Sequence, residues 1–218
     1  MSIRANYEKE LKGIFDSLEL MCHHIESAIE TCVKALIDRD FELANEVYEE
    51  ERLIDKLEHD IERACLKVLL METPVARDFR EVSAALKMIT DLERIGDQAL
   101  EIAEITTQFS DKGYIEKMEH IPQMAFIVIQ MVKDGVQAYI NHDLELARSL
   151  NKTDDKVDDL FTTVMSDLTA FIKKNPDNAE QAIMFMMITK YLERIGDHAV
   201  NIGEWVEYAI TGNRPEHE

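Results

Sequence analysis

Apolar side chains recur every three or four positions along almost the whole chain, which is the spacing of one face of an α-helix. The first three stripes of this kind span residues 7–36, 44–68 and 79–103. The rest of the chain repeats the plan, with stripes at 118–139, 147–171 and 182–206. Six helices of roughly 30 residues, each about 45 Å long, are therefore predicted.

Two short segments carry residues that begin helices, and a third carries those of a turn. Thr73-Pro74 places a capping hydroxyl before a proline at the first helical position, and Asn175-Pro176 restarts the chain in the same way. The segment 109–117 contains Ser-Asp-Lys-Gly-Tyr and is the predicted boundary between two halves. Three long antiparallel helices close one bundle. The sequence therefore predicts an all-α protein of two tandem antiparallel three-helix bundles, at residues 1–110 and 111–218.

The two halves share short stretches, which indicates an internal duplication. Leu-Glu-Arg-Ile-Gly-Asp occurs at 92–97 and again, letter for letter, at 192–197. Asp-Leu-Glu-Leu-Ala at 143–147 echoes Asp-Phe-Glu-Leu-Ala at 40–44. Each copy of the longer motif has a Glu and an Asp four residues apart, which puts both carboxylates on one helix face. Because like charges at that spacing repel each other, something is expected to compensate for them, either a bound cation or only water and arginine.

Acidic side chains also interrupt the apolar stripe of the second helix in each half. Glu51 and Asp154 occupy equivalent positions in that stripe, and each is followed one turn later by an Asp. A carboxylate that faces inward without a partner is costly, and the second and third helices of a bundle are antiparallel neighbours. The acidic pairs of each half are therefore expected to face each other. The predicted metal-binding residues are Glu51, Asp55, Glu93 and Asp97 in the first half and Asp154, Asp158, Glu193 and Asp197 in the second.

Clustered carboxylates suit hard cations such as magnesium, manganese or calcium, and carboxylate-bridged iron or zinc is also consistent with them. Two alternatives stay open. In one, Arg94, Arg194 and lysines neutralise the acids in surface ion pairs, Glu51 lies at the edge of its stripe, and the protein is a metal-free scaffold. In the other, the cluster serves a metal-dependent hydrolase or oxidase.

Motifs typical of enzymes are missing from the sequence. Di-iron helical bundles usually carry Glu-x-x-His on two helices, and here no histidine has an acid three residues before it. His198, beside Asp197, is a candidate extra ligand in the second half. There is no G-x-S-x-G motif, phosphate-binding loop or dinucleotide-binding glycine motif. The sequence therefore predicts a protein that is not an enzyme.

Composition excludes several function classes. The chain has 24 basic and 44 acidic residues and a net charge of −20, so the basic surface that binds nucleic acid or an anionic membrane is missing. Cys22, Cys32 and Cys65 are odd in number and lie in helical patterns, as expected of reduced core residues. No signal sequence is visible, and no uncharged apolar stretch is long enough to span a bilayer. A cytoplasmic protein is expected.

Three features together resemble the PhoU family over essentially the whole chain. They are the duplicated Leu-Glu-Arg-Ile-Gly-Asp, the Asp-Phe-Arg at 78–80 that follows Thr73-Pro74, and the twofold three-helix plan. Members carry acid-x-x-x-Asp motifs that bind clusters of iron or other metal ions. The resemblance implies this role for the eight carboxylates named above. Because the second half has Asn-Ala-Glu at 178–180, any role of Arg80 belongs to the first half.

The resemblance also implies a regulatory function. PhoU proteins are cytoplasmic, usually dimeric adaptors between the high-affinity phosphate ABC transporter and the phosphate-sensing histidine kinase. This chain is therefore expected to form a homodimer, to contact the transporter's nucleotide-binding subunit and the kinase, and to meet the membrane only through them. It is expected to restrain the phosphate-starvation response and to limit phosphate uptake when phosphate is plentiful.

Overall fold

The computed structural model describes residues 3–71, 75–109 and 119–215. Within these residues the chain forms six α-helices, one turn of 3₁₀ helix and no strand, which confirms the all-α prediction. The helices are α1 (Ile3–Asp38), α2 (Phe41–Met71), α3 (Ala76–Thr106), α4 (His120–Asn141), α5 (Leu144–Lys174) and α6 (Ala179–Thr211).

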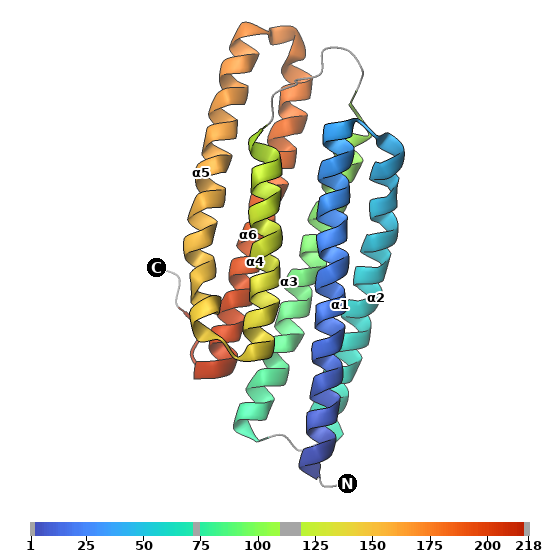
Figure 1. The fold of residues 1–218 in the computed structure, drawn as a ribbon, viewed down its shortest axis with the longest axis vertical. Helices are drawn as coiled ribbons and strands as arrows, with labels where there is room; N and C mark the ends of the chain where they lie inside the picture. Colours follow the sequence, from blue (N-terminus) through green and yellow to red (C-terminus); the bar gives the residue numbers. More distant parts are fainter. Residues whose placement is uncertain (1–2, 72–74, 110–118, 216–218) are drawn as a thin grey trace.

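Two three-helix bundles, α1–α3 and α4–α6, lie side by side with all six helices running along the long axis of the molecule (Figure 1). The predicted apolar stripes form the core: on α2, for example, Val47, Ile54 and Ile61 are at most 1% exposed. The prediction of two tandem bundles is therefore confirmed. The predicted division at residues 110 and 111 and the predicted helix start at Thr73-Pro74 both lie outside the described residues.

Helix α4 is shorter than predicted. It has 22 residues, and it begins at His120 with Pro122 in its first turn, where a proline is tolerated. Met118, the predicted first member of its stripe, lies outside the described residues. The predicted restart at Asn175-Pro176 is a single 3₁₀ turn, Pro176–Asn178, which leads into α6.

Equivalent aspartates begin the second helix of each bundle. Asp40 Oδ1 accepts a hydrogen bond from the backbone N–H three residues later (2.9 Å), and Asp143 Oδ1 does the same (3.0 Å). These bonds satisfy backbone donors that have no partner within the first helical turn. The preceding residues, Arg39 and His142, adopt left-handed backbone conformations with φ of 56° and 55°. The echo between 40–44 and 143–147 thus encodes the same tight turn twice.

The structure also bears on two expectations from composition. The three cysteines are buried and form no disulfide, as predicted. None of the described helices combines the length and the apolar character that crossing a bilayer requires.

Helices α3 and α6 form a major contact between the bundles. The Tyr191 hydroxyl donates to Glu101 (3.2 Å), and Asn201 Nδ2 donates to Asp91 (3.3 Å). Residues 91 and 191 are equivalent in the duplication, and so are residues 101 and 201, so one contact is made twice in opposite order. The two helices are therefore antiparallel and related by an approximate twofold axis.

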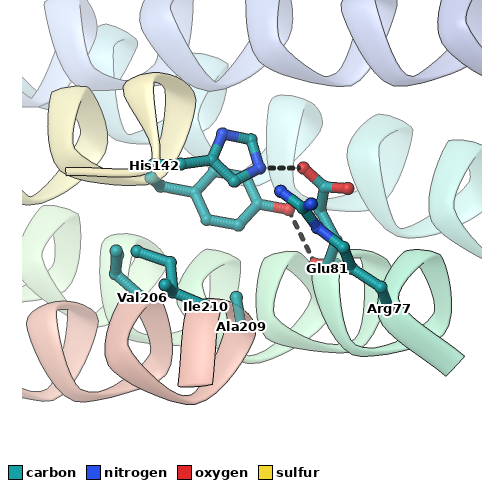
Figure 2. Close-up of a pocket in the computed structure, with 7 residues that line it drawn as sticks. Arg77, Glu81, His142, Val206, Ala209 and Ile210 are labelled. Carbon is teal, nitrogen blue, oxygen red and sulfur yellow. Dashed lines mark hydrogen bonds and ion pairs between the residues drawn. The ribbon is translucent and has the colours of Figure 1, made fainter. Parts of the chain in front are cut away.

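A second polar contact joins the bundles close to the start of α3 (Figure 2). Glu81 is only 7% exposed; its Oε2 accepts from the Tyr7 hydroxyl (3.2 Å), and its Oε1 lies 2.7 Å from His142 Nε2. The Tyr139 hydroxyl donates to the Glu81 backbone carbonyl (2.7 Å). The Glu81 cluster, Glu81 with Tyr7, Tyr139 and His142, thus ties α1, α3 and α4 together.

Replacing Glu81 with Gln is expected to lower the free energy of unfolding by about 1–2 kcal/mol. The carboxamide has one accepting oxygen in place of two, so either the Tyr7 hydroxyl or His142 Nε2 then faces an amide N–H₂ group. Urea denaturation measures the change. Glu49→Gln is the control, since its ion pair with Arg52 is exposed on both sides and should matter little. Equal effects of the two substitutions would show that the Glu81 cluster does not hold the bundles together.

Candidate metal centre

The four carboxylates of the first half lie on facing surfaces of α2 and α3. Glu51 and Asp55 come from α2, Glu93 and Asp97 from α3, and all four are partly buried. Burial raises the pKa of Glu51, and the negative charges of Asp55, Asp97 and Glu93 raise it further. The pKa of Glu93 is raised by burial and by the charges of Asp97 and Asp55, against the lowering effect of a neighbouring arginine. The structure thus brings together the four residues predicted for this half.

The second half repeats the arrangement on α5 and α6, with one carboxylate held deeper. Burial raises the pKa of Asp154 to about 7, and the charges of Asp158, Asp197 and Glu193 contribute in that order. The pKa values of Asp158 and Asp197 are also raised, mainly by burial. Asp158 and Asp197 are nevertheless exposed residues, so the expectation of four inward-facing acids is wrong for these two.

Among the eight predicted ligands, Asp154 has the least satisfied environment. Its Oδ1 is buried and has no hydrogen-bond partner among the described residues. This oxygen lies against Gly196, where an added Cβ would be only 2.6 Å from it. At the equivalent Gly96 the neighbour is instead the side chain of Ile54, 3.1 Å from an added Cβ. The glycine of the second repeat therefore makes room for a carboxylate that needs a proton or a cation.

Basic side chains neutralise part of each carboxylate quartet, which is the set of four predicted acids in one half. Arg94 lies 3.5 Å from Glu93 and 2.9 Å from Asp97, and Lys190 pairs with Glu193. Arg194, the other arginine expected to do this, forms no ion pair with a described acid. Within the described part of the chain, no ion pair involves the quartet acids of α2 (Glu51 and Asp55) or those of α5 (Asp154 and Asp158). Among the described residues, surface ion pairing therefore accounts for Glu93, Asp97 and Glu193, but not for the other five carboxylates.

The side chains as they lie do not form a completed coordination shell. Among the described residues, no three Asp, Glu, His or Cys side chains are gathered closely enough to hold one ion. Both quartets concentrate negative charge, and binding a cation requires their side chains to change rotamer. The donor set itself fits a hard cation, because it consists of carboxylate oxygens and includes one buried oxygen with no partner.

His198 has a structural contact, which disfavours its candidate role as an extra ligand. Its Nδ1 lies 2.9 Å from Asp91 Oδ1 on the other bundle. Asn201 approaches the same oxygen, so both residues belong to the contact between α3 and α6. Lys190 is one of the lysines of the surface-pairing alternative, which the sequence analysis did not identify individually. It precedes Glu193 by three positions, a spacing at which helical side chains meet, so the sequence did contain the signal.

Comparison with known proteins agrees with the duplication seen in the fold. The PhoU domain model matches this chain twice, at residues 18–106 and 121–206. The phosphate-specific transport system accessory protein PhoU homolog of Clostridium acetobutylicum is 31% identical over 97% of this chain and 97% of its own length. The crystal structure of PhoU from Pseudomonas aeruginosa superposes with a TM-score of 0.89 at 31% identity, covering 95% of this chain and all of that one.

A more distant structure shares the fold. The phosphate transport system regulatory protein PhoU from Streptococcus pneumoniae has a TM-score of 0.86 at 22% identity, over 99% of this chain and all of that one. The repeated family match and the similarity over the full length of the chain point the same way. This chain belongs to the PhoU family.

Proposed function

We propose that this chain is a negative regulator of phosphate uptake and of the phosphate-starvation response. It acts as a homodimeric cytoplasmic adaptor between the nucleotide-binding subunit of the phosphate ABC transporter and the sensor histidine kinase. Family membership supports this proposal, because one relative is named an accessory protein of phosphate-specific transport and another a regulatory protein of that system. Long, mutually packed helices also suit an adaptor, since they present extended and rigid surfaces to partners.

The adaptor is proposed to bind metal ions at both quartets. The observation that carries this part is the buried Asp154 Oδ1, which faces Gly196 without a hydrogen-bond partner among the described residues. Glu51, Asp55, Glu93 and Asp97 would hold metal in the first half, and Asp154, Asp158, Glu193 and Asp197 in the second. Iron, zinc, magnesium and manganese all accept carboxylate ligands. A bound cation would supply the positive charge that lets Asp154, whose pKa burial and neighbouring acids raise to about 7, stay ionised at neutral pH.

Each metal site would link two helices of one bundle. In the first half the ligands come from α2 and α3, and in the second from α5 and α6. Anything that binds the folded state and not the unfolded state stabilises the fold. The proposed role of the metal is therefore to hold these helix pairs in one arrangement, on which the partner surfaces depend, and not to transform a substrate.

Binding measurements test the adaptor role directly. The chain should bind the purified nucleotide-binding subunit and the cytoplasmic part of the sensor kinase in pull-down experiments, with binding that changes when phosphate is added. Protein treated with a chelator should bind less than protein reloaded with metal. If neither partner binds under any of these conditions, the adaptor proposal is wrong.

Turnover separates this proposal from the alternative of a metal-dependent hydrolase or oxidase. Protein loaded with Mg²⁺, Mn²⁺ or Fe²⁺ is incubated with phosphoester substrates, and product is measured for the unaltered chain and for Glu93→Gln. No difference from buffer is expected. A rate that Glu93→Gln abolishes would establish the enzyme in place of the adaptor.

A further inference from the structure

An open apolar groove runs between the C-terminal part of α1 and the N-terminal part of α4. It has a volume of about 400 Å³, and its apolar lining includes Val33 and Ile37 from α1 and Pro122, Phe126 and Ile129 from α4. Ile37 is 53% exposed and Phe126 is 72% exposed. Two large apolar side chains thus face solvent in one groove, where their burial by a partner would be favourable.

Polar side chains bridge the same helix pair further along. α1 and α4 lie side by side and run in opposite directions (Figure 1). Lys133 of α4 donates to Glu26 of α1 (2.8 Å), and Gln137 donates to Glu19 (3.2 Å). Beside Ile37 and Phe126 the side chains that line the groove from α4 are apolar instead. The groove therefore lies along the last two to three turns of α1.

The charged side chains on the edge of the groove indicate which charge a bound partner should carry. Glu30, Lys34 and Asp38 line it on the α1 side, one turn apart from each other, and all three are exposed. The two acids are eight residues apart, which corresponds to about 12 Å along a helix. Acidic groups therefore flank the apolar floor at both ends, and the single lysine lies between them. The net charge of −20 favours a basic partner as well.

We propose that this groove binds one amphipathic helix of a partner protein. Large apolar side chains at i and i+3 or i+4 pack between Ile37 and Phe126, and Lys or Arg at both ends of the helix pair with Glu30 and Asp38. A helix suits the site because two neighbouring helices leave a groove into which a third packs, as the helices of each bundle do. This inference rests on the proposed adaptor function and names the surface that it uses.

The test measures binding of the two partners named above, the nucleotide-binding subunit and the cytoplasmic part of the kinase. Ile37→Ser and Phe126→Ser should each raise the dissociation constant for at least one partner tenfold or more. Ile183→Ser is the matched control, because Ile183 is also 53% exposed on a helix and is not among the residues that line this groove. All of these side chains are at the surface, and circular dichroism checks that each variant folds.

A second pair of variants tests the charge. Replacing Glu30 and Asp38 with Lys should weaken binding to the same partner and reduce its salt dependence, while Glu42→Lys with Glu46→Lys, on α2, should change it less. If the unaltered chain binds and all groove variants bind within twofold of it, the groove proposal is overturned and the adaptor function stands. If the unaltered chain binds neither partner, both proposals fall.

A second copy of the chain is the other possible occupant of the groove, and sedimentation velocity distinguishes it. The proposal expects the same oligomeric state for the unaltered chain, Ile37→Ser and Phe126→Ser. Dissociation of a dimer by the two groove variants, but not by Ile183→Ser, would make the groove an interface between copies and would overturn the proposal of a partner helix.

Discussion

Asp154→Asn is expected to deplete metal from the second half of the protein and, in metal-free protein, to raise stability at neutral pH. Asn keeps the shape of the side chain but removes the charge. The ligand set of that half then has one anionic oxygen donor fewer, at the position where the oxygen is buried and has no partner among the described residues. Metal content by elemental analysis should fall, while the first half keeps its own carboxylates.

The expected gain in stability follows from the direction of the pKa shift. Burial and neighbouring acids raise the pKa of Asp154 from 3.8 to about 7 in the folded state. Between those two values the folded state binds more protons than the unfolded state. The free energy of unfolding of metal-free protein therefore falls as pH rises from about 4 to about 7. The amide side chain of the Asp154→Asn variant cannot ionise, so the variant should lose this part of the pH dependence.

The size of the effect is limited by solvent. A shift of this size corresponds to about 4 kcal/mol for a fully buried group, and partial exposure of Asp154 reduces the expected gain to about 1–2 kcal/mol. Thermal unfolding of chelator-treated protein at pH 5 and pH 7 measures it. Added metal should restore the stability of the unaltered chain at pH 7, because the cation replaces the proton.

Asp167→Asn is the control for this experiment, since Asp167 lies exposed on the same helix and outside the quartet. It should change neither metal content nor the pH dependence. Should Asp154→Asn retain the full metal content and the same pH profile, Asp154 would have no part in a metal site. The buried oxygen would then need another explanation.

Gly203→Ala is expected to lower the free energy of unfolding by about 3 kcal/mol, because the added methyl group has no space. A Cβ at this position would lie 2.8 Å from the backbone oxygen of Ala147 and 3.0 Å from Leu150 Cδ1 on α5. A flexible side chain can move aside, but a backbone carbonyl moves only if its helix moves. The substitution should therefore push α5 and α6 apart.

Gly13→Ala provides the opposite control. Nothing lies within 4 Å of an added Cβ at Gly13, which is inside α1. Alanine there should stabilise the protein by about 0.5–1 kcal/mol, through the better helix propensity alone. Urea denaturation of both variants measures the contrast. Equal stabilities would show that the contact of Gly203 with α5 is looser than the structure places it.

The helices themselves could be predicted because their signal is local. A stripe of apolar residues at a spacing of three and four reflects helix geometry, and each stripe is long enough to be unambiguous. The caps Asp40 and Asp143 also act locally, within three residues, but the sequence analysis identified only their repetition and the structure revealed their capping role. The length of α4 was harder to predict, because an apolar pattern continues smoothly past the point where a helix begins.

The quartets were predictable from the duplication. The spacing of Glu93 and Asp97 determines that both lie on one helix face, and the repeat extends the argument to the other half. The depth of each acid was not predictable, because it depends on the neighbouring helix. Asp154 is deep because Gly196 of α6 leaves room for it, whereas the same space beside Gly96 is taken by Ile54.

The sequence by itself therefore determined the helices, their grouping into two equivalent bundles, and the residues that make up each carboxylate quartet. Only the tertiary structure decided how the bundles meet, through Asp91 and Asn201 and through the buried Glu81, and which apolar side chains stay exposed. The physical reason is the distance along the chain over which each interaction acts. Helix periodicity and capping act over a few residues, whereas Glu81 and His142 are 61 positions apart and meet only when two helices pack.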